Sequence, residues 1–111
     1  MSALMFQRCR SCDHAWWLTR SACPRCGAAD PTDEAASGRA TLYASTRVHL
    51  TPDAALKPLL PFDIALVDLV EGPRVMAHLS ATAPIGAALT GRMAMRGGRS
   101  MPVFEAVEEE P

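Results

Sequence analysis

The sequence predicts an all-β protein, in which an N-terminal rubredoxin-like zinc ribbon is followed by a small five-stranded barrel. Two observations lead to this prediction. All four cysteines fall in two CxxC pairs near the start of the chain, and polar and apolar residues alternate with a period of two in much of the remainder. With 111 residues, the chain is long enough for one barrel core and too short for a two-lobed enzyme.

Four parts are expected along the chain: the ribbon at 1–30, a polar linker at 31–38, the barrel at 39–108 and an acidic tail at 109–111. Charge is divided unevenly between them. Residues 1–27 carry four arginines and one aspartate, a net charge of +3 before metal binds, whereas the rest of the chain carries seven basic and eleven acidic side chains, a net charge of −4. The acidic larger part argues against a broad surface for nucleic-acid phosphates.

No segment approaches the roughly 18 consecutive apolar residues that a membrane helix needs. The first residues lack a basic segment followed by an apolar stretch, so no secretory signal is expected. The sequence therefore predicts a cytoplasmic protein without a membrane partner, in a compartment that keeps thiols reduced. In such a compartment, two matched CxxC pairs favour a metal site over two disulfides.

The predicted metal ligands are Cys9, Cys12, Cys23 and Cys26. Each CxxC pair can turn two sulfurs toward one ion, and the ten residues between Cys12 and Cys23 are enough to bring the pairs together. Four thiolates at about 2.3 Å satisfy tetrahedral Zn²⁺. Because every sulfur would then be bound and the metal would have no open position for water, the expected role of this single zinc is to fold the ribbon.

The residues that follow each pair support this interpretation. Gly27 follows the second pair and Asp13 the first, and both residue types tolerate the left-handed backbone that such a turn needs. A c-type haem requires CxxCH, but Asp13 stands between the first pair and His14. A thioredoxin-like site would use one CxxC at the start of a helix. An iron centre of rubredoxin type would use the same four ligands and remains the alternative.

Five segments of the remainder are predicted strands, at 39–50, 62–70, 74–80, 87–96 and 100–108. Gly72 and the sequence GGR mark two hairpin turns, and 51–61, with three prolines, is expected to be a loop. This order of strands is compatible with an OB-fold, a partly open Greek-key barrel, with an SH3-like barrel as the alternative. Alternation in the first strand places six residues on one face: Ala40, Leu42, Ala44, Thr46, Val48 and Leu50.

Four stretches together resemble a known family: FQRCRSCDHAWWLTRSACPRCG, SGRATLYASTRVH, PFDIALVDLVEGPRVMAHLS and IGAALTGRMAMRGGRSMPVFE, which cover nearly the whole chain. This is the zinc-ribbon plus OB-fold family catalogued as domain of unknown function thirty-five. Its members look like non-catalytic partners of thiolase-superfamily enzymes, including acyl-CoA thiolases, acetyl transferases and retro-aldolases of sterol side-chain degradation. This chain differs at His78, where many members have a small polar residue such as Asn, and in the short segment 82–86.

The resemblance implies that the ribbon and barrel dock on a thiolase-fold catalytic subunit and help to hold the coenzyme A part of its substrate. Five basic residues are expected on a solvated face, with contacts to the phosphates of coenzyme A as the alternative: Arg47, Lys57, Arg92, Arg96 and Arg99. Three methionines are expected to fill gaps in the core, with a soft groove for an acyl chain as the alternative: Met93, Met95 and Met101.

Two adjacent tryptophans lie on the expected return strand of the ribbon. Neighbouring residues of a strand face opposite ways, so Trp16 and Trp17 can both pack at the junction of ribbon and barrel, or one can anchor a partner subunit. No catalytic role is predicted for His14, His49 or His78, because their spacing suggests no nucleophile or carboxylate pair beside them.

The sequence thus supports two functions of different classes. The first, by resemblance, is an accessory subunit that is not itself an enzyme and that supports the stability and acyl-CoA binding of a thiolase-superfamily enzyme. The alternative is a module for single-stranded nucleic acid, which needs a positive groove lined with stacking aromatics. The predicted barrel is net acidic and contributes Tyr43, Phe62 and Phe104, of which both phenylalanines are expected in the core.

Overall fold

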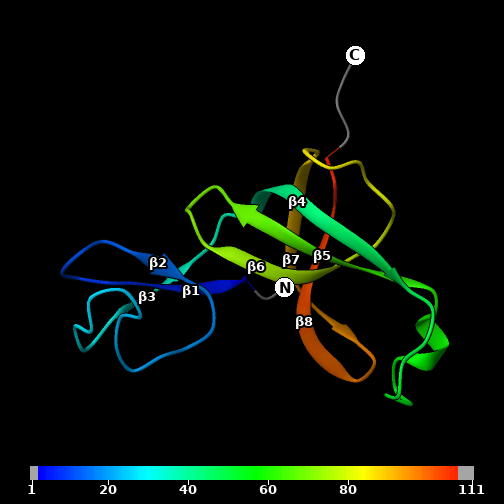
Figure 1. Cartoon of the computed structure of the whole chain (residues 1–111), viewed down its shortest axis with the longest axis horizontal. Coiled ribbons are helices and arrows are strands. Elements are labelled where there is room, and N and C mark those ends of the chain that lie inside the picture. Colours follow the sequence, from blue (N-terminus) through cyan, green and yellow to red (C-terminus); the bar gives the residue numbers. More distant parts are fainter. Residues whose placement is uncertain (1–2, 108–111) are drawn as a thin grey trace.

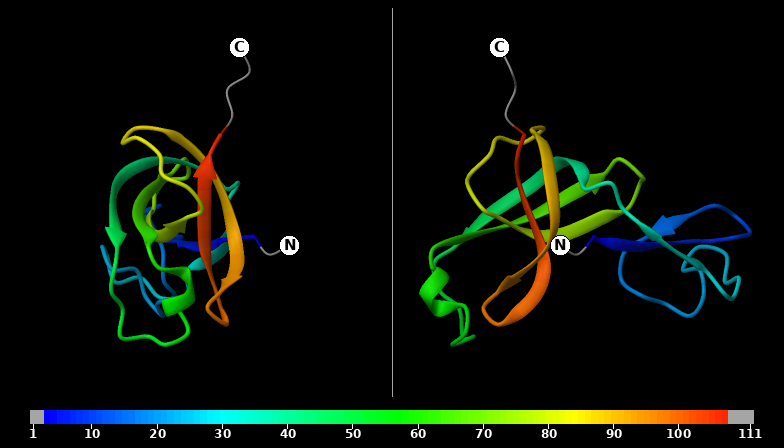
Figure 2. Two further views of the ribbon diagram at one scale, coloured as in Figure 1. Left: turned by 90° about the vertical axis from the view of Figure 1, so that its right-hand side faces the viewer. Right: turned by 180° about the vertical axis from the view of Figure 1, so that it is seen from behind.

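Two β-sheets make up the part of the chain that the structure, a computed structural model, describes: residues 3–107 (Figure 1). The smaller is the ribbon, a three-stranded sheet in the order β2-β1-β3, and the larger is a closed barrel in the order β4-β5-β6-β8-β7. Figure 2 shows the ribbon projecting from one side of the barrel. The predicted all-β fold of ribbon and barrel is confirmed.

The ribbon sheet is built around β1 (Met5–Arg8), which pairs antiparallel with both β2 (Ala15–Trp16) and β3 (Thr32–Ala35). The polar stretch 31–38, expected to be a linker, therefore contains a strand of the ribbon. Its sequence TDEA has no apolar alternation that would mark a strand. β3 exists because all four of its residues pair with β1.

The barrel contains the five predicted strands: β4 (Arg39–Val48), β5 (Phe62–Leu69), β6 (Arg74–Leu79), β7 (Ala88–Arg96) and β8 (Arg99–Ala106). Neighbouring strands are antiparallel except β6 and β8, whose parallel pairing closes the barrel. The predicted end of the last strand at 108 and the acidic tail lie outside the described residues.

Both predicted hairpins are present. Gly72 has a φ of 118° between β5 and β6. Gly97 and Gly98, between β7 and β8, have φ values of 58° and 80°, as a type I′ turn requires at both central residues. The predicted loop 51–61 contains a single turn of 3-10 helix, η1 (Lys57–Leu59). Among the described residues, no helix has the length and apolar character needed to cross a bilayer.

A β-bulge in β4 corrects the predicted alternation of that strand. Leu42 pairs with Val67 and Ala44 with Leu66, so that Tyr43 has no partner and the register shifts by one residue. Beyond a bulge the opposite set of side chains faces the core. The placement of Ala44, Thr46 and Val48 on the face of Leu42 is therefore wrong. Leu50, expected on the same face, lies beyond the end of β4 and is 88% exposed.

The barrel core extends into the ribbon. Its largest fully buried side chains include Phe104, Leu42 and Leu89, and Leu4, just before β1, belongs to the same apolar cluster. Ala36, which directly follows β3, packs against this cluster and donates its N–H to the carbonyl oxygen of Leu4 at 2.8 Å. The ribbon is thus attached to the barrel through buried contacts on both of its longer strands.

Gly91 on β7 is required by the packing of the core. A Cβ atom at this position would overlap the ring of Phe104, which is fully buried, so the ring or the strand would have to shift. We expect Gly91→Ala to lower the free energy of unfolding by about 1–3 kcal/mol, measured by urea denaturation. Thr90→Ser, on an exposed side chain of the same strand, is the control and should change it by about 0.5 kcal/mol or less. Equal stability of Gly91→Ala and wild type would contradict this packing.

Candidate metal centre

The four predicted ligand cysteines converge on one point. Their sulfur atoms all lie within 4.8 Å of one another, with Cys9 Sγ 3.5 Å from Cys26 Sγ and Cys12 Sγ 3.7 Å from Cys23 Sγ. Four sulfurs at about 2.3 Å from a tetrahedral ion are separated by about 3.8 Å, so this spacing fits Zn²⁺. Within the described part of the chain, they are the one group of three or more His, Cys, Asp or Glu side chains spaced to hold a metal.

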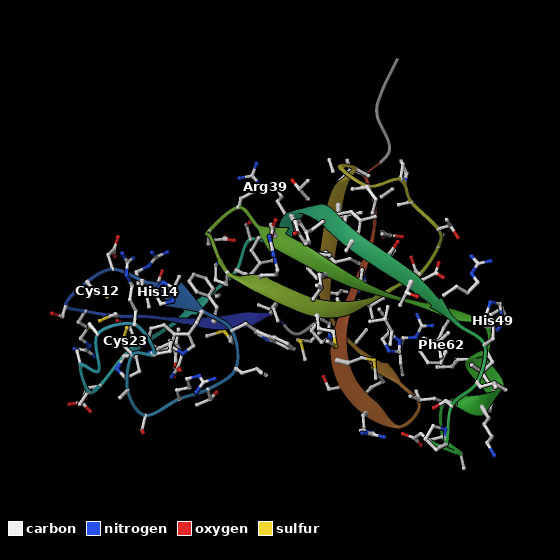
Figure 3. All side chains as sticks on the ribbon, viewed as in Figure 1. Cys12, His14, Cys23, Arg39, His49 and Phe62 are labelled. Atoms are coloured by element: carbon white, nitrogen blue, oxygen red, sulfur yellow. The ribbon has the colours of Figure 1, made fainter. Side chains whose placement is uncertain are left out.

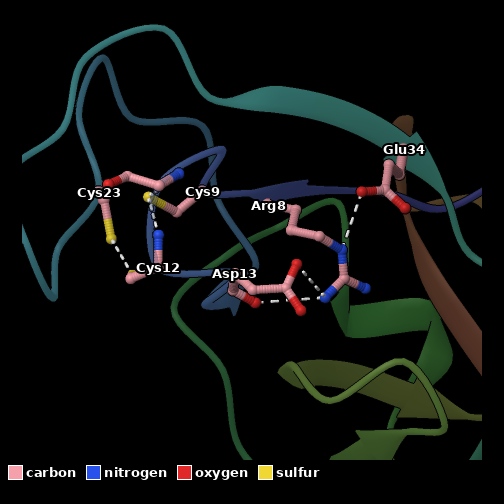
Figure 4. Close-up of polar contacts among 7 residues, drawn as sticks. Arg8, Cys9, Cys12, Asp13, Cys23 and Glu34 are labelled. Atoms are coloured by element: carbon pink, nitrogen blue, oxygen red, sulfur yellow. Dashed lines mark hydrogen bonds and ion pairs between the residues drawn. The ribbon is translucent and has the colours of Figure 1, made fainter.

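The two CxxC turns have matching geometry, which explains why the sulfurs meet. Cys9 Sγ accepts the backbone N–H groups of Ser11 and Cys12, both at 3.3 Å (Figure 4). In the same way, Cys23 Sγ accepts those of Arg25 at 3.3 Å and Cys26 at 3.4 Å. Each turn thus points its first sulfur at its own backbone amides and its second across to the other turn.

The residue after each pair has a left-handed backbone, as predicted. Asp13 has a φ of 66° and Gly27 one of 81°, and their N–H groups donate to the carbonyl oxygens of Cys9 and Cys23 at 3.2 and 2.9 Å. The chain then leaves each turn antiparallel to its entry. Cys9 N–H donates to His14 O at 2.8 Å, and Cys23 N–H to Ala28 O at 2.9 Å.

The electrostatics of the cluster favour a bound cation. The backbone N–H of Cys12, with that of Ser11, lowers the pKa of the Cys9 thiol to about 6. The backbone amide of Ala28 lowers the pKa of Cys26, but the neighbouring sulfurs, Cys9 first, outweigh it and raise that pKa to about 12. Thiolates in such close contact repel one another, and a divalent cation removes this repulsion as it replaces the protons.

Trp16 covers the inner side of the cluster. It is 6% exposed and packs with Cys9 and Cys23, the two buried ligands. Its indole N–H donates to Gln7 Oε1 at 2.9 Å, and the same oxygen accepts the backbone N–H of Arg20 at 2.7 Å. Gln7, which no motif or period in the sequence marks, therefore holds together β1, β2 and the loop that leads to the second pair.

Charged side chains tie the first turn to β3. Arg8 Nε donates to Glu34 Oε2 at 2.9 Å, and Arg8 Nη1 lies 3.7 Å from Asp13 Oδ1 (Figure 4). Gln7 Nε2 donates to Asp33 Oδ1 at 3.1 Å. The polar residues of β3 are thus the partners of β1 side chains, which explains a strand that has no apolar residue of its own to bury.

The other candidate residues occupy different environments. Trp17 directly follows β2, is half-buried and packs against the barrel core, whereas Trp16 packs with the cysteines. His14 stacks on Trp16 with ring centroids 5.8 Å apart, and His49 is exposed at the end of the barrel far from the cysteines (Figure 3).

The three methionines are likewise divided. Met93 packs against the core as expected, whereas Met95 is 67% exposed, so the core placement is wrong for Met95. Met101 lines a hollow on the outside of the barrel.

His78 lies on the outer face of β6 yet is only 9% exposed. Its ring stacks on that of Phe62, with centroids 4.9 Å apart and planes 17° from parallel. Its Nδ1 atom is buried without a hydrogen-bond partner among the described residues. Burial, and secondly the positive charge of Arg96, hold the pKa of His78 below its ordinary value.

Two of the five candidate basic residues are bound to carboxylates. Arg47 Nε donates to Asp63 Oδ1 at 3.0 Å, and this hydrogen bond lowers the pKa of Asp63. Arg99 forms an ion pair with Asp53. The remaining three make no ion pair within the described part of the chain; Lys57 and Arg92 are exposed and Arg96 is half-buried.

Ribbon, metal cluster and barrel define the class of protein: a zinc ribbon joined to an OB-fold barrel. Residues 2–32 match the family described as ChsH2, rubredoxin-like zinc ribbon domain, and residues 33–93 match ChsH2, C-terminal OB-fold domain. The chain therefore belongs to this ChsH2 family of zinc-ribbon and OB-fold proteins, also called DUF35. The boundary between the two matches falls within β3.

Similar proteins carry related names. A probable enoyl-CoA hydratase alpha subunit of Thermomonospora curvata is 33% identical over 81 residues, which are 73% of this chain and 25% of that protein. A DUF35 domain-containing scaffold protein of Methanocaldococcus jannaschii is 30% identical over 73 residues, 65% of this chain and 51% of that protein. The chain thus spans about a quarter and about half of the lengths of these curated relatives.

Solved structures agree with the fold. The structure named Ltp2-ChsH2(DUF35) aldolase superposes with a TM-score of 0.77 and 29% identity, covering 94% of this chain and 84% of the matched one. A DUF35-family protein of unknown function from Sulfolobus solfataricus superposes with a TM-score of 0.65 and 14% identity over 95% of this chain and 76% of that one, which supports the fold alone.

We expect Cys23→Ser to lose the bound metal and unfold the ribbon, because structural zinc contributes on the order of 10–16 kcal/mol in small peptide sites. Both tryptophans lie in the ribbon, so their emission should shift to the red while zinc content, measured by mass spectrometry, falls toward zero. Ser11→Ala keeps the backbone N–H that Cys9 accepts and should retain the metal. Unchanged zinc and unchanged emission in Cys23→Ser would contradict the assignment.

Acidification from about pH 7 to pH 5 should cost more stability in the wild type than in His78→Asn. The pKa of His78 is lower in the folded state than in the unfolded chain, so below about pH 6.5 the unfolded state binds a proton that the native state does not. Zinc release and the other histidines act in both proteins, so the difference between their urea midpoints isolates His78. Urea midpoints that fall in parallel with pH in the two proteins would contradict this contribution of His78.

Proposed function

We propose that this chain is a non-catalytic, zinc-binding accessory subunit that docks on the catalytic subunit of a thiolase-superfamily enzyme, such as a thiolase, acyltransferase or retro-aldolase. In that complex it supports the stability and acyl-CoA binding of the enzyme. The observation that carries the proposal is its likeness, over 94% of its length, to a chain of the structure named Ltp2-ChsH2(DUF35) aldolase. That name joins a DUF35 protein to a second protein in one enzyme.

The arrangement of reactive side chains supports a role without catalysis. All four cysteines of the chain belong to the metal cluster, so a bound ion leaves none of them as a nucleophile. Within the described residues, no histidine makes a hydrogen bond to a hydroxyl, thiol or carboxylate that it could activate or that could orient it. A zinc with four thiolates has no open position at which to activate water.

The names of the curated relatives point the same way. One is called an enoyl-CoA hydratase subunit, and the other a scaffold protein. An acyl-CoA enzyme that uses a separate scaffold would account for both names. Among the basic residues considered for the phosphates of coenzyme A, Lys57 and Arg92 are exposed and without an ion pair in the described part of the chain, and they support such a contact at the interface.

A nucleic-acid-binding role is less favoured by the placement of the aromatic residues. Phe104 is in the core and Phe62 is stacked beneath His78. Tyr43 is 51% exposed, but the guanidinium of Arg74 lies 3.6 Å from its ring centroid and covers one face. Bases need free aromatic faces on which to stack, and none of these three rings offers a row of them.

The proposal is tested with the full chain, tagged and expressed from its native genome. A thiolase-fold protein should co-purify with it in a fixed ratio. The chain alone should show no turnover of acyl-CoA, and the separated catalytic subunit should regain activity and thermal stability when the chain is added. Cys23→Ser, with its ribbon unfolded, should fail to restore either property.

A catalytic subunit that is fully active and stable without this chain would overturn the proposal. Salt-dependent binding of single-stranded DNA at micromolar or lower concentrations, measured by fluorescence anisotropy, would instead favour the alternative.

A further inference from the structure

A groove of about 410 Å³ lies where the ribbon meets the barrel. Its walls come from both parts of the chain: Trp17 and Leu18 from the ribbon, and Ile64, Met76, His78 and Met101 from the barrel. We call it the junction groove. It is large enough for a group of side chains or a small ligand, and its lining is almost wholly apolar.

The barrel side of the junction groove is an outer sheet face, not the core. Along β6, Val75, Ala77 and Leu79 are buried in the barrel core, so Met76 and His78 point outward. Ile64 is paired with His78 and shares that face. A solvated outer face is normally polar, yet this one presents isoleucine and methionine, and Met76 is 56% exposed.

Leu18 forms the opposite wall in an unfavourable conformation. Its φ is 77°, in the left-handed region that residues with a Cβ adopt at a cost, and its side chain is 60% exposed. The other left-handed positions of the ribbon are occupied by glycine or aspartate, which tolerate this backbone. Burial within the chain therefore does not offset the strain at Leu18, and backbone strain of this kind often marks a functional site.

A second hollow, of about 250 Å³, shares Trp17 and Leu18 with the junction groove and is also lined by Met5 and Phe6. Leu18 therefore borders both hollows, and Met5 is 48% exposed. A small ligand would fill one hollow and leave the other open. A protein surface can cover Leu18 and insert side chains into both hollows, as anchors do at protein interfaces.

Charge around this surface indicates the chemistry of the partner. No acidic side chain lines the junction groove in the described part of the chain, and the positive charge of Arg96 contributes to the lowered pKa of His78 in its wall. Arg20, two residues after Leu18, is exposed, and neither arginine makes an ion pair there. Asp33, an acidic residue, borders the smaller hollow and accepts a hydrogen bond from Gln7, so the basic border belongs to the junction groove. A second copy of the chain would bring the same two arginines to this groove and therefore matches it poorly.

We propose that Leu18 and the two hollows beside it form the surface that docks on the catalytic subunit, and that the matching segment of that subunit carries apolar side chains bordered by aspartate or glutamate. This inference rests on the proposed function and names the surface through which that function operates. It accounts for an apolar outer sheet face, a strained exposed leucine and a basic border at one place on the molecule.

The test uses the catalytic subunit that co-purifies with the wild-type chain, and measures its Kd for purified variants by calorimetry. Leu18→Gly and Leu18→Asn remove the apolar side chain and install residues that tolerate a positive φ. Both should weaken binding by about tenfold to a hundredfold, the effect of losing one buried leucine, while zinc content stays at wild-type level and the melting temperature does not fall. Leu50→Gly, which removes a leucine that is 88% exposed at the opposite end of the barrel, should bind as the wild type does.

Arg96→Glu tests the chemistry of the partner's border. It should weaken binding by about fivefold at low ionic strength, with a smaller effect at high salt. Tighter binding of Arg96→Glu to the catalytic subunit would contradict the proposal that the partner's segment is bordered by aspartate or glutamate.

Two results would overturn the docking surface while leaving the proposed function intact. The first is wild-type affinity in both Leu18 variants. The second is a wild-type chain that dimerises in analytical ultracentrifugation through a contact abolished by Leu18→Gly, because a second copy would then occupy the groove. Failure of the wild-type chain itself to bind any thiolase-fold subunit would overturn the proposed function and, with it, this inference.

Discussion

The convergence of four thiolates on one point is the constraint on which the ribbon depends. Apart from the ligands Cys9 and Cys23, its buried metal-side cluster consists of little more than Trp16 and a half-buried alanine. So small a core cannot offset the entropy of ordering the chain, and a metal ion must supply what packing does not. The backbone amides that donate to Cys9 and Cys23 orient the sulfurs. Gln7, on β1, is hydrogen-bonded to Trp16 on β2 and to Asp33 on β3, and so connects all three strands beside the cluster.

The folded ribbon also positions residues that pack on the barrel core. Leu4 and Ala36 flank the ribbon strands and pack in or against the barrel core. Trp17, which also packs against this core, directly follows Trp16, the residue that covers the cysteine cluster. Loading the cluster with metal and holding the shape of the junction are therefore linked. A folded ribbon places Leu18 across the junction groove from the outer face of the barrel. A structural metal in the ribbon would in this way support a protein whose proposed function is to bind a partner.

Two of the three aromatic rings of the barrel are used inside its own structure, where Phe104 fills the core and Phe62 stacks on His78. The third, Tyr43, is half exposed, but Arg74 covers one of its faces. Barrels of this architecture bind nucleic acids through exposed rings on which bases stack. The same fold can thus serve a different purpose when few of its rings are free to stack and its apolar outer face is aliphatic.

The sequence by itself determined the four cysteines that converge on one point, the left-handed residues Asp13 and Gly27, the five barrel strands and both hairpin turns. These features are local, because a spacing or a period of a few residues specifies them. Only the tertiary structure decided that the polar segment TDEA is a strand, that Gln7 links the ribbon, and that a bulge at Tyr43 moves Thr46 and Val48 off the face of Leu42. It also decided that an outer sheet face meets Leu18 in a groove. Each of these depends on which distant strand or side chain lies opposite, and that pairing leaves no periodic trace in a single segment of sequence.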